Sequence, residues 1–122
     1  MAGAANQVQN LDDPEHFDRA FKAINQKVNV EGNHAYHKVP IKLLNAKTQV
    51  VSGALYHYDV LVGDSDTKKS DADPQSLSKE NLKYSQGGKR EVYKVKVWEQ
   101  PWKDFVEYTV EKERDVAADE QI

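Results

Sequence analysis

Residues 36–62 read YHKVPIKLLNAKTQVVSGALYHYDVLV, and this stretch decides the fold. Apolar and polar side chains alternate on both sides of a short turn at Gln49–Gly53. The apolar members are Val39, Ile41 and Leu43 before the turn, and Ala54, Tyr56, Tyr58, Val60 and Val62 after it. A period of two is typical of strands with one buried face. Two such runs this close together predict an antiparallel hairpin, and Gly53 supplies the backbone freedom that its connection needs.

Two further strands are expected after a long polar segment. Residues 63–79 are rich in Asp, Ser and Lys and contain Pro74, so they predict a surface loop. Residues 89–98 alternate again, residues 99–102 form a turn, and residues 106–110 form the last strand. Residues 111–122 are strongly charged, and we expect them to fray.

A helix is predicted upstream of the hairpin. Asp13 can cap its start, Pro14 suits its first position, and Glu15 lies at the positive end of the helix dipole. The apolar residues that follow share one helical face: Phe17, Ala20, Phe21, Ile24 and Val28. We expect the helix to end between residues 29 and 33, and residues 1–12 to form a flexible tail.

This order of elements predicts an α+β fold. We expect a single domain spanning residues 1–122, with one N-terminal helix packed across a four- to five-stranded antiparallel sheet. A chain of 122 residues can bury one core of this kind.

Composition excludes several classes of function. The formal net charge is -3, which argues against general affinity for nucleic acid or anionic membranes. The chain has no cysteine, so disulfides, thiol catalysis and thiolate metal sites are excluded. The first residues lack the features of a signal peptide, so both a cytoplasmic location and secretion after removal of a leader stay open.

Other candidate sites do not hold together chemically. His34, His37 and His57 have no acidic or cysteine partner arranged with them, so we expect no metal site. Residues 64–75 lack the glycine and the glutamate that a calcium loop requires, and residues 87–90 lack most of a phosphate loop. With no nucleophile–base pair either, we expect neither a catalytic residue nor a cofactor.

Two hairpin motifs and a glycine in the tail resemble those of the cystatin family. Residues 49–53 match its Gln-x-Val-x-Gly signature, Pro101-Trp102 matches its second-loop motif, and Gly3 precedes a single helix. The similarity continues in the flanking residues 54–58 and 93–100 and covers roughly residues 13–110. The chain departs from each subfamily: it lacks the disulfides of secreted animal cystatins, has the Pro-Trp that stefins lack, and does not match the helix signature of plant cystatins. Gly3 also lies about one residue from the usual spacing.

The resemblance implies a reversible, competitive, tight-binding inhibitor of papain-like cysteine proteases such as cathepsins. In the family, the tail and the two hairpins enter the protease cleft as an apolar wedge. The residues implied in protease binding are Gly3, Gln49, Val50, Val51, Ser52, Gly53, Pro101 and Trp102. The alternative is a module with the same fold that binds or has a structural role without inhibiting.

Two finer expectations follow from the resemblance. Asn33 aligns with a site that some cystatins use against legumain, although Gly32 and His34 replace the usual Ser and Asp; a simple helix-ending turn is the other interpretation. A β-branched Val51 at a hairpin tip predicts backbone strain, which opening of the hairpin into a domain-swapped dimer would relieve. The active form would then be the monomer.

Overall fold

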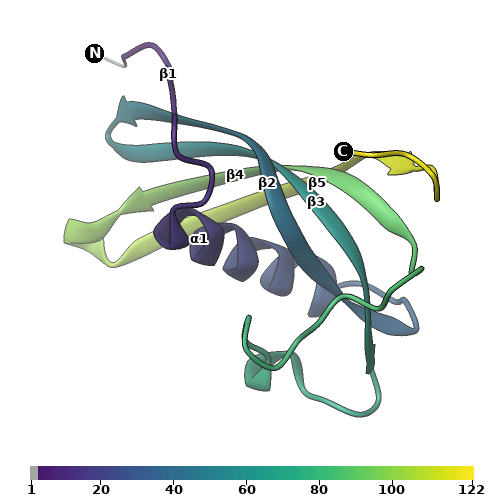
Figure 1. Cartoon of the computed structure of the whole chain (residues 1–122). Helices are drawn as coiled ribbons and strands as arrows, with labels where there is room; N and C mark the ends of the chain where they lie inside the picture. Colours follow the sequence, from purple (N-terminus) through teal and green to yellow (C-terminus); the bar gives the residue numbers. More distant parts are fainter. Residues whose placement is uncertain (1–2) are drawn as a thin grey trace.

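The computed structural model describes residues 3–122, which form one helix and one antiparallel sheet. The sheet has five strands in the order β1-β2-β3-β4-β5, so each strand pairs with its neighbours in sequence. Their bounds are Asn6–Gln7 (β1), Tyr36–Val51 (β2), Gly53–Lys68 (β3), Arg90–Gln100 (β4) and Phe105–Val116 (β5). The sheet curves around the helix α1, Pro14–Ile24 (Figure 1). The expected α+β arrangement is confirmed.

The helix begins as its sequence predicts. The Asp13 carboxylate accepts a hydrogen bond from the backbone N–H of Glu15 at 2.9 Å, and Pro14 follows in the first turn. The last turn differs from an α-helix, because residues Asn25–Asn29 form a π-helical turn. This widened turn places Asn29 inside the protein, where its side chain bonds the backbone N–H and C=O of Lys38 at 2.6 and 2.9 Å. Asn29 thereby joins the end of the helix to the start of β2.

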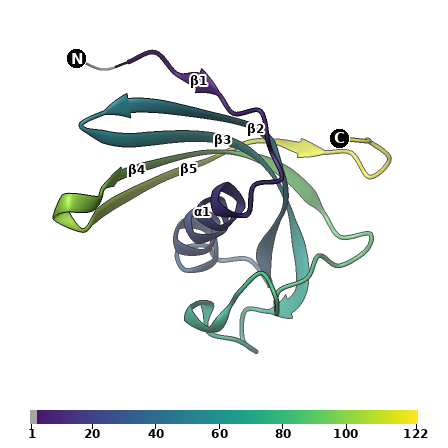
Figure 2. The ribbon, with the colours of Figure 1, turned by 60° about the vertical axis from the view of Figure 1, so that its left-hand side comes forward.

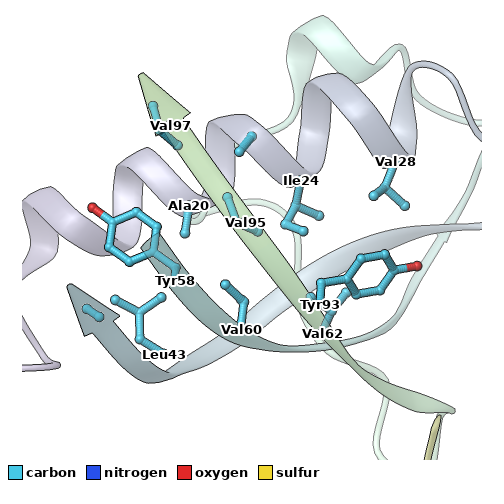
Figure 3. Packing of buried hydrophobic residues seen from close by; sticks show 12 residues of the cluster. Ala20, Ile24, Val28, Leu43, Tyr58, Val60, Val62, Tyr93, Val95 and Val97 are labelled. Carbon is cyan, nitrogen blue, oxygen red and sulfur yellow. The ribbon is translucent and has the colours of Figure 1, made fainter. Parts of the chain in front are cut away.

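The core lies between the helix and the concave face of the sheet (Figures 2 and 3). The helix contributes its small and branched residues, and the three long central strands contribute the alternating residues. The main cluster contains Ala20, Ala23, Ile24, Val28, Leu43, Ala46, Tyr58, Val60, Val62, Tyr93, Val95 and Val97. The apolar face predicted for α1, β3 and β4 therefore lies against the core. In β2 the prediction is wrong for Ile41, which falls at a register shift between Pro40 and Lys42 and packs instead with Leu61 and Val92.

Strands β3 and β5 extend farther than the sequence predicted. Residues 64–68, expected in the loop, continue β3 because they pair with the first residues of β2. The segment from Glu111, expected to fray, continues β5 as far as Val116. Val116 packs against Leu61 and Val92, and the Arg90 side chain donates to the carbonyls of Ala117 and Glu120 at 2.9 and 2.7 Å. The loop between β3 and β4 accordingly begins at Lys69.

The N-terminal segment also lies against the sheet rather than apart from it. Asn6 and Gln7 pair with Thr48 and Lys47 of β2, and the Val8 N–H donates to the Ala46 carbonyl at 2.9 Å. The segment thus follows the edge of β2 toward the β2–β3 hairpin. Among residues 3–122, no helix is long and apolar enough to span a membrane.

A buried charge cluster lies at the end of the sheet away from that hairpin. Glu91 of β4 is only 4% exposed, and its carboxylate is 2.9 Å from both Lys38 and Lys112. Lys38 also bonds Asp64 of β3 at 2.5 Å. Burial alone would raise the pKa of Glu91, but the hydrogen bonds from Lys112 and Lys38 outweigh burial and lower it. The cluster ties four strands together by charge.

Candidate functional site

The β2–β3 hairpin has a very short tip. Val51 pairs with Gly53, so Ser52 alone lies between the two strands. Gly53 adopts φ +101°, and a Cβ there would lie 2.1 Å from the Glu99 carbonyl oxygen of β4. Glycine is therefore required both by the backbone angle and by the close approach of the neighbouring strand.

The prediction of backbone strain at Val51 is wrong. Among residues 3–122, Asp104 is the single non-glycine residue with positive φ. Val51 ends β2 in an ordinary extended conformation because Gly53 takes the left-handed angle that the turn needs. The tip is thus relaxed at its β-branched residue.

The tip of the first hairpin is fastened to β4 by side-chain hydrogen bonds to Ser52. The Trp98 indole N–H and the Gln100 side-chain amide both donate to the Ser52 carbonyl at 2.9 Å. The Gln100 amide also lies 3.1 Å from the Ser52 hydroxyl, and Gln100 is buried. These bonds fix the tip of one hairpin on the base of the next.

The second hairpin projects beside the first (Figure 1). Pro101–Lys103 form a 3-10 turn that Asp104 closes in a left-handed conformation, with its N–H bonded to the Pro101 carbonyl at 3.0 Å. Trp98 and Phe105 pack edge to face beneath the turn at 5.3 Å. Trp102 is left 63% exposed. A large aromatic side chain held out on a rigid turn is typical of a binding surface.

Gly3 is bonded to the β2–β3 hairpin, on the side of that hairpin away from β4. Its N–H donates to the Val50 carbonyl at 2.8 Å, and its carbonyl accepts from the Gln49 side-chain amide at 3.0 Å. Because the Gln49 amide nitrogen is used there, its oxygen faces His57 Nε2, which donates to it at 3.2 Å. Val50 itself is 66% exposed. The tail segment is thus bonded to the β2–β3 hairpin through both the backbone and a side-chain relay.

The structure therefore gathers the predicted protease-binding residues at one end of the molecule. We call this end the wedge edge: Gly3, Gln49–Gly53 and Pro101–Trp102. The sequence did not single out three residues that hold it in place, namely His57, Trp98 and Gln100. Their position in strands that flank both motifs was the available signal, but only the fold shows which atoms they contact.

Asn33 is exposed in the loop between the helix and β2. This loop lies at the end of the sheet away from the two hairpins (Figure 1). Lys69 holds this loop by bonding the carbonyls of Asn29 and, at 3.2 Å, Gly32. A Cβ on Gly32 would lie 2.3 Å from the Val28 carbonyl and 2.5 Å from the His34 ring, so serine does not fit there. Burial and the charges of Lys69 and Lys38 lower the pKa of His34. Among residues 3–122 no group of His, Asp or Glu could hold a metal ion.

The sequence model of the cystatin domain matches residues 3–115, which is nearly the whole chain.

The chain belongs to the cystatin family.

Relatives of this cystatin carry matching names. It is 38% identical over 97 residues to cystatin cpi-1 of Caenorhabditis elegans, covering 79% of this chain and 70% of that protein. It is 40% identical to cystatin cpi-2 of Brugia malayi and 42% identical to onchocystatin of Onchocerca volvulus. In both cases the match covers 69% of this chain, and the chain spans about half of the relative's length. Cystatins are protease inhibitors and not enzymes, which confirms that expectation.

Solved cystatin structures share the fold. Al-CPI superposes with a TM-score of 0.71 at 26% identity, covering 91% of this chain and all of that one. The salivary cystatin of the soft tick Ornithodoros moubata gives 0.78 at 17% identity, with 92% and 98% covered. Dimeric human cystatin F gives 0.77 at 19% identity, with 93% and 89% covered. The last two, at their low identity, bear on the fold alone.

Proposed function

We propose that this cystatin inhibits papain-like cysteine proteases reversibly and competitively, with the wedge edge entering the protease cleft. The observation that supports this most is the exposure of Val50 and Trp102 on two tips that share the Ser52 carbonyl as a fastening point. Exposed apolar groups on a rigid edge lower the ordering cost of binding. The edge contains no group that reacts with a protease, so it blocks the cleft without chemistry.

The test is a papain assay with a peptide substrate. We expect full inhibition near equimolar protein and an apparent inhibition constant that rises with substrate concentration, as competition requires. Trypsin, a serine protease, serves as the control and should keep its activity. Undiminished papain activity in a large excess of folded protein would favour a non-inhibitory binding or structural module instead.

A second candidate function concerns legumain. Asn33 is exposed on a loop that Lys69 holds in place, at the far end from the wedge edge. We expect Asn33→Lys to abolish legumain inhibition and to leave papain inhibition unchanged, because the two sites share no residue. If the wild-type protein does not inhibit legumain, the loop is only a turn that ends the helix and has no inhibitory role.

The active form in this proposal is the monomer. Because only Ser52 separates β2 from β3, opening the tip would join residues 36–68 into one continuous strand. That strand could pair with a second molecule and form a domain-swapped dimer. Opening removes the first hairpin from the wedge edge, so the swapped dimer should not inhibit papain.

A further inference from the structure

The outer face of the sheet is the face turned away from α1 (Figure 2). A row of polar residues crosses this face. Directly paired residues of an antiparallel sheet point to the same side. The strand register therefore aligns one residue from each strand: Gln7, Lys47, His57, Lys96 and Thr109. Three consecutive members are basic. With strands about 4.8 Å apart, these three lie along a line of about 10 Å.

The two lysines of this row have no acidic partner. Among residues 3–122, neither Lys47 nor Lys96 forms an ion pair. Lys94, in the next row, is by contrast bound to Asp59 and Glu113, each at 3.1 Å. Lys47 and Lys96 lie on either side of His57, and each is directly paired with it. The row thus holds positive charge that the protein itself does not neutralise.

The same three basic residues line a shallow hollow of about 360 Å³. The amide side chains of Asn45 and Gln49 border it, and the carboxylate in it, Asp59, is bound by Lys94. The Gln49 oxygen is bound by His57 Nε2. The Asn45 oxygen accepts from the Gln7 side-chain amide, which leaves the Asn45 amide nitrogen facing the hollow. The groups free to bind a ligand therefore include the two ammonium groups, the remaining ring nitrogen of His57 and this amide nitrogen.

We propose that Lys47, His57 and Lys96 form an oxyanion site that binds sulfate or phosphate groups. The site is open and linear, so it fits a chain of such groups lying across the strands, as in a sulfated glycan; the free inorganic anion is the other source of the same chemistry. Glu107 and Glu111 flank Thr109 on β5 and confine the ligand to the part over β2–β4. The inference does not depend on protease inhibition.

The imidazole of His57 provides a direct measurement. Burial, followed by the charges of Lys96 and Lys47, lowers the pKa of His57 in the free protein. A bound oxyanion would favour the protonated ring, so we expect the pKa of His57 to rise by about one pH unit when ligand saturates the site. The experiment follows the His57 ring resonances by NMR across pH, with sodium sulfate or a heparin tetrasaccharide as separate probes at constant ionic strength.

Matched variants test the assignment. Lys47→Gln/Lys96→Gln should weaken tetrasaccharide binding about tenfold and raise the pKa of His57 without any ligand. Lys22→Gln/Lys83→Gln removes the same charge from exposed positions outside the row and should bind as the wild type does. If the pKa of His57 rises at a much lower concentration of tetrasaccharide than of sulfate, the ligand is a glycan chain. If both probes act at the same concentration of anionic groups, the ligand is the free anion. No response of His57 to either probe, or an equal response in both double variants, would overturn the proposal.

Discussion

At the scale of single residues, Trp102 belongs to the wedge edge but contributes little to the stability of the fold. Its side chain is 63% exposed on a turn that other residues stabilise. We expect Trp102→Ala to weaken papain binding by about 2–4 kcal/mol, mainly through faster dissociation. The melting temperature should stay within about 1 °C of the wild type, because surface substitutions have little effect on stability. Stopped-flow inhibition kinetics and thermal melting together would check this; an unchanged dissociation rate would remove Trp102 from the binding surface.

Gly53, unlike Trp102, matters for the stability of the fold, since both its backbone angle and its surroundings require glycine. We expect Gly53→Ala to lower the free energy of unfolding by at least about 2 kcal/mol and to weaken papain inhibition, because the hairpin must move away from the Glu99 carbonyl. Gly87 is the matched control: it has φ +81° but nothing within 4 Å of an added Cβ. Gly87→Ala should therefore cost only the angle, about 1 kcal/mol. Equal losses for both variants in urea unfolding would show that the contact with Glu99 adds nothing.

The family resemblance implied that the two motifs lie on one edge, but it did not indicate how they are fastened. Gly53 followed from the turn, whereas its contact with the Glu99 carbonyl depends on the twist of the next strand. Gln100 looked like part of a turn and is instead a buried donor to Ser52. Such bonds join residues about 48 positions apart, so no local spacing indicates them.

At the scale of elements, the charge cluster around Glu91 links β2, β4 and β5. The folded state holds the pKa of Glu91 below its unfolded value of about 4.3. The stabilisation is therefore complete above that value and is lost as the pH falls through the folded pKa. We expect Glu91→Gln to lower the free energy of unfolding by about 3 kcal/mol at pH 7, because Lys38 and Lys112 lose a partner.

The measurement is urea unfolding at a series of pH values from 7 to 3. The difference between Glu91→Gln and the wild type should shrink in the acid range. Glu113→Gln, which removes an exposed partner of Lys94, should change stability by less than about 0.5 kcal/mol at every pH. A constant difference for Glu91→Gln down to pH 3 would contradict the assignment.

Element boundaries were the least predictable part of the fold. Hydrophobic periodicity located the helix and the four long strands correctly, since each buries one face. It missed the ends of β3 and β5, because residues such as Asp64 and Lys112 are polar yet remain in the sheet through ion pairs. The π-helical turn at Asn25–Asn29 likewise depends on Asn29 meeting the backbone of β2.

At the scale of the whole molecule, the hairpin fastening controls the proposed exchange between monomer and swapped dimer. Gln100→Leu removes one donor to Ser52 in the closed hairpin. We therefore expect this variant to form more dimer than the wild type after mild heating, with papain inhibition confined to the monomer. Size-exclusion chromatography followed by papain assays on each peak provides the measurement. Gln75→Leu, at an exposed loop position, is the control and should match the wild type. A dimer that inhibits as well as the monomer would show that its first hairpin is still closed.

The order of strands leaves β5 as the long free edge of the sheet, because β1 covers part of β2 on the other side. A free edge offers unpaired backbone groups to any neighbouring molecule, and charged side chains are the usual protection. Residues 111–115 of β5 are all charged: Glu111, Lys112, Glu113, Arg114 and Asp115. We expect replacing Glu111 and Glu113 by threonine to accelerate fibril growth in concentrated solution, measured by thioflavin T fluorescence. No acceleration would mean that another part of the edge prevents strand addition. The charged end of β5 thus bears on colloidal behaviour: we expect it to keep a strand-rich protein from serving as a template for its own polymer.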